Sequence, residues 1–274
     1  MSVDHLLIID PQNDFCDLPE ILKPQGQNPT LPVGGAHADM LRLSDWIDRN
    51  RQHLDAVTVT MDHHHRLDIA HPSFWRNGDG SRLRPFTSIT SAQVKEGEFR
   101  PAPGLSAERA ISYLQALENS GRFTHMVWPV HCQIGTWGQC VHGTLQAALD
   151  RWEDETARTV FHVLKGENPW TEHYSALRAE IPVDADPATG LNHALLERLA
   201  KADRVLVGGE AGSHCVRATV EHLVENWHGD LSRIVLLTDA MSPVGGFEAA
   251  QEAFLEASKS KGLTISATDK IRLS

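Results

Sequence analysis

The sequence predicts an α/β fold: a three-layer α/β/α sandwich around a mainly parallel, Rossmann-like sheet of roughly six strands. The first observation behind this prediction is the order of segments, because apolar runs alternate with segments whose apolar residues recur at helical spacing. The second is that the apolar runs are continuous, as at residues 234–237, which is typical of strands covered on both faces. The connections between such strands are expected to be right-handed crossovers.

The strands are predicted from these runs in chain order. Residues 5–10 form an apolar run that ends in Asp10, and residues 56–62 form a second run that ends in Asp62. Further strands are expected at residues 124–128, 159–164, 204–209 and 233–238, with a weaker one at 263–267.

The helices are predicted from helical spacing between these runs. In the first of them, Met40, Leu41, Leu43, Trp46 and Ile47 form one broad apolar stripe. The expected helices cover residues 35–52, 104–118, 138–152, 191–200, 215–228 and 246–259, with approximate ends.

Two stretches interrupt this rhythm. Residues 76–103 and 180–190 are rich in glycine, proline and charged residues, and long irregular loops in compact domains are either functional covers or disordered. No repeat, heptad run or shift in composition divides the chain. We therefore expect a single domain over residues 1–274, with loop insertions at about 76–103 and 180–190.

Bulk composition excludes several classes of protein. The net charge of −11 and the isoelectric point near 5.8 argue against nucleic acid or an anionic membrane as a partner. The four cysteines show no framework spacing, and we see neither a signal-like start nor a long apolar run. These features predict a cytoplasmic protein.

Cys215 lies where the strand at 204–209 passes through a glycine-bearing turn into a helix. A helix start offers free backbone N–H groups and the positive end of the helix dipole, which favour a thiolate and an oxyanion. The position therefore suits a nucleophile. A buried packing residue at a helix start is the alternative.

Other chemically active side chains also stand at predicted strand ends. Asp10 ends the first strand, Asp62 the second, and Lys165 the strand near residue 164. Because ligands of parallel α/β sheets collect at the carboxyl ends of strands, these groups and Cys215 are expected to converge on one crevice. Taken singly, Asp10 could cap a turn and Lys165 could lie on the surface.

A metal-type cluster follows the second strand. Asp62 and His64 project from the same side of an extended segment, and His71 and His131 lie in nearby loops. One carboxylate with two or three imidazoles suits a divalent cation, with Zn²⁺ as the first expectation and Fe²⁺ or Mn²⁺ as alternatives. A solvated run of surface histidines at residues 63–65 is the other interpretation.

Together these segments resemble the isochorismatase-like cysteine hydrolase superfamily, and within it the nicotinamidases most closely. The matching segments follow the family's order over nearly the whole chain: Ile9-Asp10-Pro-Gln12-Asn-Asp-Phe15, Asp62-x-His64 with His71-Pro-Ser73-Phe74, Trp128-Pro-x-His131-Cys132-x-x-Gly135-Thr-x-Gly138, Lys165-Gly166 with Tyr174-Ser175-Ala176, and Gly209-x-Ala211-x-x-x-Cys215-Val216-Arg217.

The resemblance implies a role for each matching residue. Cys215 would be the nucleophile, Asp10 the general base and Lys165 the electrostatic partner. A cis peptide at Glu210–Ala211 would direct the N–H groups of Ala211 and Cys215 at the substrate oxygen. The remaining roles are a divalent metal held by Asp62, His64 and His131, with His71 as a further ligand, and aromatic walls at Phe15 and Trp128.

The implied reaction is metal-dependent hydrolysis of a small-molecule amide through a cysteine thioester, with nicotinamide as substrate, as in pyridine nucleotide salvage. Family relatives also suggest a homo-oligomer. Three features depart from the family: Glu210 replaces an apolar residue, Gly212-Ser213-His214 precedes the cysteine, and both insertions are long. The alternatives are an N-carbamoyl amidase, an isochorismatase-type hydrolase, or a non-catalytic binding protein of the same fold.

Overall fold

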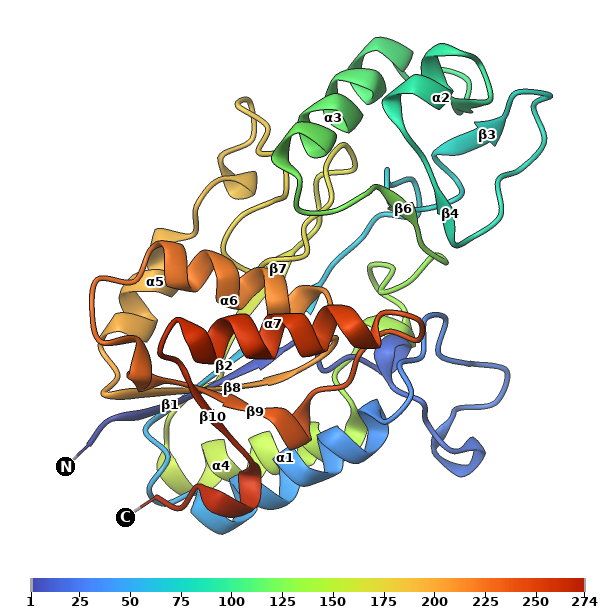
Figure 1. Ribbon diagram of the computed structural model, residues 1–274. Helices are drawn as coiled ribbons and strands as arrows, with labels where there is room; N and C mark the ends of the chain where they lie inside the picture. The colour runs from blue at the N-terminus through green and yellow to red at the C-terminus, as the bar shows by residue number, and fades with distance from the viewer. Residues whose placement is uncertain (1, 274) are drawn as a thin grey trace.

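The computed structural model describes residues 2–273 and has the three predicted layers (Figure 1). Its central sheet is parallel throughout, with the strand order β10-β9-β8-β1-β2-β7. The strands are β1 (Asp4–Ile9), β2 (Ala56–Asp62), β7 (Phe161–Lys165), β8 (Arg204–Gly209), β9 (Ile234–Leu237) and β10 (Thr264–Ser266).

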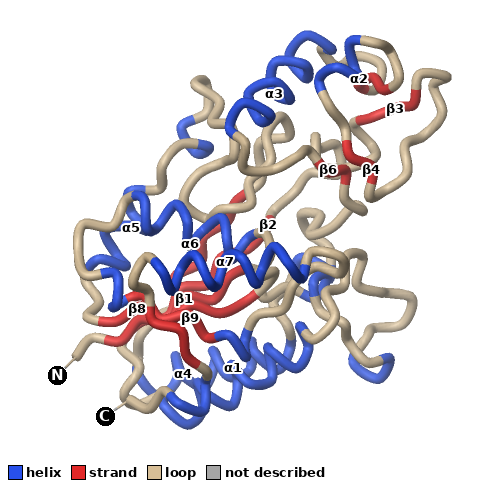
Figure 2. The backbone as a smooth tube through the Cα atoms, viewed as in Figure 1, coloured by secondary structure: helices blue, strands red, loops and turns tan. Residues whose placement is uncertain are grey.

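Helices cover both faces of this sheet. On one face lie α1 (Ala36–Asn50) and α4 (Gly143–Thr156), as Figure 2 shows. On the other lie α5 (His193–Ala200), α6 (Cys215–Glu225) and α7 (Glu248–Ser260). Every residue of β1 is buried, in agreement with its continuous apolar sequence.

The apolar stripe of α1 faces the sheet as predicted, with one exception. Met40, Leu43, Trp46 and Ile47 are fully buried, whereas Leu41 is 37% exposed. In a helix, neighbouring residues differ by about 100° in direction, so Leu41 points about 130° away from the midpoint of Met40 and Leu43 and lies outside the buried stripe.

One expectation about the sheet is corrected and a weaker one is confirmed. The strand expected at 124–128 shrinks to β6 (Met126–Val127), which pairs antiparallel with β4 (Thr87–Ser88) outside the main sheet. The weaker candidate at 263–267 supplies β10 instead. A short apolar run does not reveal its partner strand, which is why the sequence misassigned the first of these.

The stretch at 76–103 is not an irregular loop. It contains β4, most of β3 (Trp75–Asn77), α2 (Ser91–Lys95) and β5 (Phe99–Pro101), and β3 pairs antiparallel with β5. With α3 (Ala107–Ser120) these elements enclose a hydrophobic cluster of their own, which includes Phe74, Trp75 and Leu114. In Figure 1 they form a lobe that projects beyond the sheet, and we call residues 69–127 the lobe.

The second stretch, at 180–190, carries one 3₁₀ turn at Pro187–Thr189. A similar turn at Trp137–Gln139 delays the start of α4 to Gly143, where the sequence had suggested about 138. The single-domain organisation stays a prediction. Within residues 2–273, none of the helices has both the length and the apolar character that crossing a bilayer requires.

Gly209 is the point where β8 leaves the sheet, and only glycine fits there. Its φ is +115°, and a Cβ at this position would overlap the backbone of Ile9 in the neighbouring strand. We expect Gly209→Ala to lower the free energy of unfolding by about 3 kcal/mol or more, because backbone strain and overpacking add.

Urea denaturation measures that loss. Gly143→Ala is the matched control, because no atom lies within 4 Å of the Cβ it would add at the first residue of α4. Equal stability of the two variants would contradict this account of Gly209.

Candidate active site

The predicted crevice exists at the carboxyl edge of the sheet. Asp10 directly follows β1, Asp62 ends β2 and Lys165 ends β7, and the sheet register places Asp62 opposite Lys165. Cys215 begins α6 beyond the end of β8, which is the neighbour of β1. Four residues that are far apart in the sequence are therefore brought together by strand order alone.

Lys165 is the centre of this arrangement. Its Nζ lies 2.8 Å from Asp10 Oδ2, 2.5 Å from Asp62 Oδ1 and 3.7 Å from Cys215 Sγ. Nζ also donates to the carbonyl oxygen of His173 at 2.9 Å. Asp10, Asp62, Lys165 and Cys215 are all buried, so these interactions act without screening by bulk water.

Asp10 is held in place by the neighbouring strand. The hydroxyl of Thr60 donates to Asp10 Oδ1 at 2.6 Å, and the backbone N–H of Asp10 points back to Thr60. The other carboxylate oxygen faces Lys165, and ligand atoms of Asp10, Asp62 and Cys215 lie within 4.8 Å of one another. With a φ of +44°, Asp10 adopts a backbone conformation that is uncommon outside glycine and often marks functional sites.

Burial dominates the protonation of the nucleophile and its base. It raises the pKa of the Cys215 thiol well above its ordinary value, and Lys165 only partly opposes this. It also raises the pKa of Asp10, with a further rise from Asp62 and an opposing effect of Lys165. The resting site therefore favours a thiol rather than the thiolate that the helix start suggested, and a base has to remove its proton during attack.

The turn before Cys215 offers two free donors. The peptide bond Glu210–Ala211 is cis, as the sequence resemblance implied. Over residues 2–273, the N–H groups of Ala211 and Cys215 donate to no carbonyl or side chain, whereas Gly212 donates to Ser242 O and Val216 to Ala211 O. Two unpaired N–H groups beside a sulfur form a place for a developing oxyanion.

Glu210 lies behind this turn rather than in the pocket. It is fully buried, and Oε2 accepts the backbone N–H of Ser242 at 3.2 Å. Burial, followed by the nearby Asp39 carboxylate, raises its pKa well above the ordinary value. Glu210, which departs from the family pattern, therefore supports the turn and does not line the pocket.

Asp62, His64 and His131 form the candidate metal site. Their ligand atoms lie within 4.8 Å of one another, and all three side chains are buried. Nε2 of each imidazole is 3.6 Å from Asp62 Oδ2, the oxygen that Lys165 does not bind. Two atoms that share one tetrahedral zinc at 2.0–2.2 Å are roughly 3.4 Å apart, so this spacing fits a single ion.

The donor chemistry also fits. His64 Nε2 is buried without a hydrogen-bond partner among the described residues, which is costly unless a ligand uses its lone pair. His131 Nδ1 lies 2.9 Å from the carbonyl oxygen of Pro129, so it carries the proton and leaves Nε2 free.

His71 lies beside these ligands and is engaged differently. Its Nδ1 faces the carbonyl oxygen of His65 at 3.1 Å, and its Nε2 faces Nδ1 and the backbone N–H of His131 at 3.3 and 3.4 Å. The role of His71 as a further metal ligand stays a prediction. Its contacts are those of a residue that holds the His131 ring in place.

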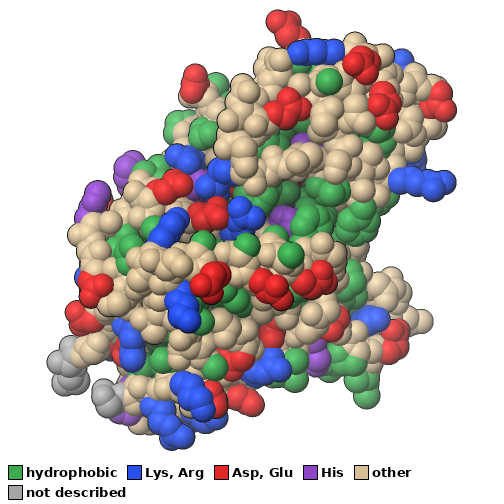
Figure 3. Space-filling model, in the orientation of Figure 1, with side chains coloured by type: hydrophobic (Ala, Val, Ile, Leu, Met, Phe, Trp, Pro, Cys, Tyr) green, Lys and Arg blue, Asp and Glu red, His purple; other side chains and the backbone are tan. Residues whose placement is uncertain are grey.

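A narrow pocket opens onto the sulfur and the metal ligands. Its cavity volume is only about 30 Å³, counted as the space open to the centre of a water molecule. Phe15 and Trp128 are among its walls, as predicted, and the lining residues are Phe15, Leu31, Asp62, Trp128, His131, Glu172, Tyr174, Ala211, His214, Cys215 and Val244. Figure 3 shows hydrophobic and histidine side chains gathered in a hollow between the lobe and the layer of α6 and α7.

Glu172 is the pocket residue that the sequence least revealed. Its side chain is buried, Oε1 accepts the N–H of His173 at 3.0 Å, and Oε2 has no partner among the described residues. Burial raises the pKa of this carboxyl to about 7. The only signal was an acid just before Tyr174, in a segment without periodicity.

His214 and Tyr174 also line this pocket. The indole N–H of Trp128 donates to the Tyr174 hydroxyl at 2.9 Å, and the His214 ring packs edge-on against Trp128. Burial lowers the pKa of His214 to about 4, so this ring is neutral near pH 7. The Gly212-Ser213-His214 segment therefore reaches the pocket through His214, whereas Glu210 does not line it.

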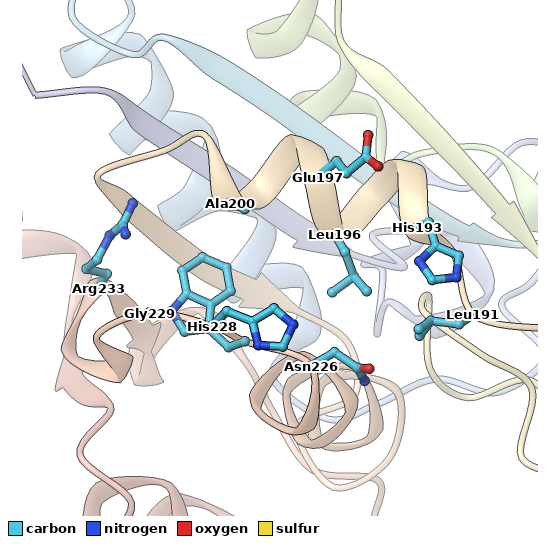
Figure 4. Close-up of a pocket in the computed structure, with 10 residues that line it drawn as sticks. Leu191, His193, Leu196, Glu197, Ala200, Asn226, His228, Gly229 and Arg233 are labelled. Carbon is cyan, nitrogen blue, oxygen red and sulfur yellow. The ribbon is translucent and has the colours of Figure 1, made fainter.

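A wider hollow of about 330 Å³ by the same measure lies elsewhere, between α5 and the segment that links α6 to β9 (Figure 4). Leu196, Asn226, Arg233 and His228 are among its lining residues. It contains none of the predicted site residues, and its side chains form no metal-type group. We therefore place the candidate chemistry in the narrow pocket.

Solved structures with this fold are known. A yeast nicotinamidase matches with a TM-score of 0.65 at 19% identity, over 96% of this chain and 99% of that one. A Pyrococcus horikoshii pyrazinamidase in complex with zinc (0.54, 20%, over 96% and 98%) and an Alkaliphilus metalliredigens isochorismatase-like hydrolase (0.53, 16%, over 98% and 97%) also match. No protein-family model and no curated protein sequence matches this chain. The chain therefore has the fold of the nicotinamidases and isochorismatase-like hydrolases, as its sequence motifs implied.

Proposed function

We propose that this protein is a metal-dependent amide hydrolase that works through a thioester on Cys215, with nicotinamide as its substrate and nicotinate and ammonia as products. The observation that carries the proposal is the joint burial of Cys215, Asp10 and Lys165 next to the Asp62, His64 and His131 cluster. A nucleophile, a base and a charge partner in mutual contact match the general pattern of covalent catalysis.

The residues divide the reaction between them. Asp10 takes the thiol proton as Cys215 attacks the amide carbon, and the N–H groups of Ala211 and Cys215 hold the resulting oxyanion. Asp10 then gives the proton to the departing ammonia, and afterwards activates the water that cleaves the thioester. Lys165 stays charged throughout, because both carboxylates oppose the loss of its proton despite its burial and raise its pKa.

Asp62, His64 and His131 would hold a divalent cation, which supplies a Lewis acid for the ring nitrogen of the substrate. The zinc complex of the pyrazinamidase neighbour supports zinc as this ion. Phe15 and Trp128 would then face a flat ring, and this orients the amide carbon at the sulfur. The narrow pocket favours a planar substrate over a bulky one.

An ammonia-release assay on a panel of amides tests the proposal. The panel contains nicotinamide, pyrazinecarboxamide, benzamide, an aliphatic amide and an N-carbamoyl compound, each with and without a chelator. We expect turnover of nicotinamide that the chelator removes and that added zinc restores. Benzamide is the matched control, because it has the same shape without the ring nitrogen and should react at least about 100-fold more slowly.

Failure on every aromatic amide would end the nicotinamide assignment. Turnover of the N-carbamoyl compound that survives the chelator would instead favour the metal-independent amidases, and hydrolysis of a vinyl ether would favour isochorismatase-type chemistry. The buried, mutually spaced ligand set speaks against both of these alternatives, since neither reaction needs it.

A further inference from the structure

Asp68 is a fully buried carboxylate that belongs neither to the triad nor to the ligand set. Its Oδ1 accepts the backbone N–H of Ala70 at 2.9 Å, which closes a tight turn. Its Oδ2 lies 3.2 Å from His64 Nδ1. These are the side-chain partners of Asp68 in the part of the chain that the structure describes, and such a site calls for a functional reason because burying a carboxylate is costly.

The contact with His64 fixes which ring nitrogen carries the proton. An ionised carboxylate can only accept hydrogen bonds, so Nδ1 of His64 is the donor to Asp68. The lone pair of the neutral ring is then on Nε2, the atom that lies 3.6 Å from Asp62 Oδ2 and has no hydrogen-bond partner among the described residues. Asp68 therefore turns the unprotonated nitrogen of His64 toward the centre of the cluster.

The ring is confined on another side as well. Gly166 has a φ of +92°, and a Cβ there would lie 2.8 Å from His64 Cε1. His131 differs, because the partner of its Nδ1 is the neutral carbonyl of Pro129. His64 is thus the one imidazole of the pair that a charged group orients.

We propose that Asp68 is a positioning residue for the metal ion: it holds His64 with Nε2 presented and, through its contact with Nδ1, makes this ring a stronger donor to the cation. This inference rests on the proposed function for the presence of a divalent ion. Outer partners that hold the second nitrogen of a ligating histidine typically contribute 10- to 100-fold in metal affinity, since they fix the ring and make it a better donor.

Zinc affinity of the purified full-length protein, without substrate, provides the test. A chromophoric chelator competes for Zn²⁺ with the wild type and with Asp68→Asn. The amide oxygen of asparagine can still accept the N–H of Ala70, so the turn is kept while the charge is lost. We expect Asp68→Asn to bind zinc about 10- to 100-fold more weakly.

Asp239→Asn is the matched control. Its carboxylate also accepts a backbone N–H and a hydroxyl, both from Thr268, and does not belong to the pocket or the ligand set. It should bind zinc within about twofold of the wild type. Thermal unfolding of the metal-free proteins checks that each variant is folded, and Asp68→Ser, whose hydroxyl can also cap the turn, replaces Asp68→Asn if the latter does not fold.

A double-mutant cycle separates positioning from general structure. In a His64→Ala background, Asp68→Asn should change the remaining zinc affinity by less than about twofold, because the carboxylate then has no ring to hold. Wild-type affinity in Asp68→Asn, or an equal loss in both backgrounds, overturns the inference and leaves the proposed function standing. Failure of the wild type to bind any divalent cation overturns both.

Discussion

Replacing Cys215 with alanine should abolish amide hydrolysis and leave the fold intact. In the proposed mechanism the sulfur of Cys215 forms the covalent intermediate, so we expect kcat to fall by about 10⁴-fold or more. Cys215 begins α6 and is buried, but alanine fits a helix start and removes only one atom, so the variant should remain folded. Steady-state ammonia release and circular dichroism measure the two effects.

Cys140→Ala is the control for this experiment, since Cys140 is an exposed free cysteine that does not line the pocket. Its activity should equal that of the wild type. Hydrolysis by Cys215→Ala at a rate within about tenfold of the wild-type rate would mean that another group is the nucleophile.

Replacing Lys165 with methionine should remove both activity and much of the stability. The two side chains are similar in length, but methionine leaves Asp10 and Asp62 buried without their shared cation. Breaking a buried ion pair by removing one partner typically costs about 3–5 kcal/mol in the free energy of unfolding. Urea denaturation of the two proteins measures this loss.

The loss should depend on pH with a defined sign. Without the ammonium group, the folded-state pKa values of both carboxyls rise above those in the unfolded chain, so their protonated forms are favoured on folding. The penalty should therefore shrink as the pH falls and grow as it rises. Lys270→Met is the control, because Lys270 is 71% exposed and its one ion pair among residues 2–273 is with Asp269, so its removal should change stability little. A penalty that is small and independent of pH would contradict the description of Lys165 as the charge partner of two carboxylates.

The residues at strand ends were predictable because sheet geometry brings them together. Asp10, Asp62 and Lys165 each terminate a recognisable apolar run, and parallel strands share one carboxyl edge. Cys215 was predictable as a candidate nucleophile because it lies in the turn between a strand and a helix. The six parallel strands, the five helices that cover the sheet and α3 of the lobe were predictable for the same reason, since hydrophobic periodicity is a local property.

Apart from α3, the lobe could not be predicted in this way. Its strands and its shortest helix have only two to five residues, too few to show a period, and their pairing depends on partners that are distant in the sequence. Proline, glycine and charge at residues 76–103 therefore suggested an irregular loop where the fold has a second hydrophobic cluster.

The supporting residues of the site were missed for a related reason. Asp68 and Glu172 lie in segments without regular structure, and their importance comes from what surrounds them in space. The carboxylate four residues after His64 is visible in the sequence, but its contact with His64 Nδ1 and its burial depend on the folded structure.

In the proposed mechanism the chemistry proceeds on the sulfur of Cys215. Rapid mixing with excess nicotinamide, acid quenching and mass spectrometry of the digested protein would detect the intermediate. We expect a nicotinoyl group on the peptide that contains Cys215, formed within one turnover and removed by hydroxylamine. Turnover of nicotinamide with no acyl group on that peptide at any quench time would contradict it.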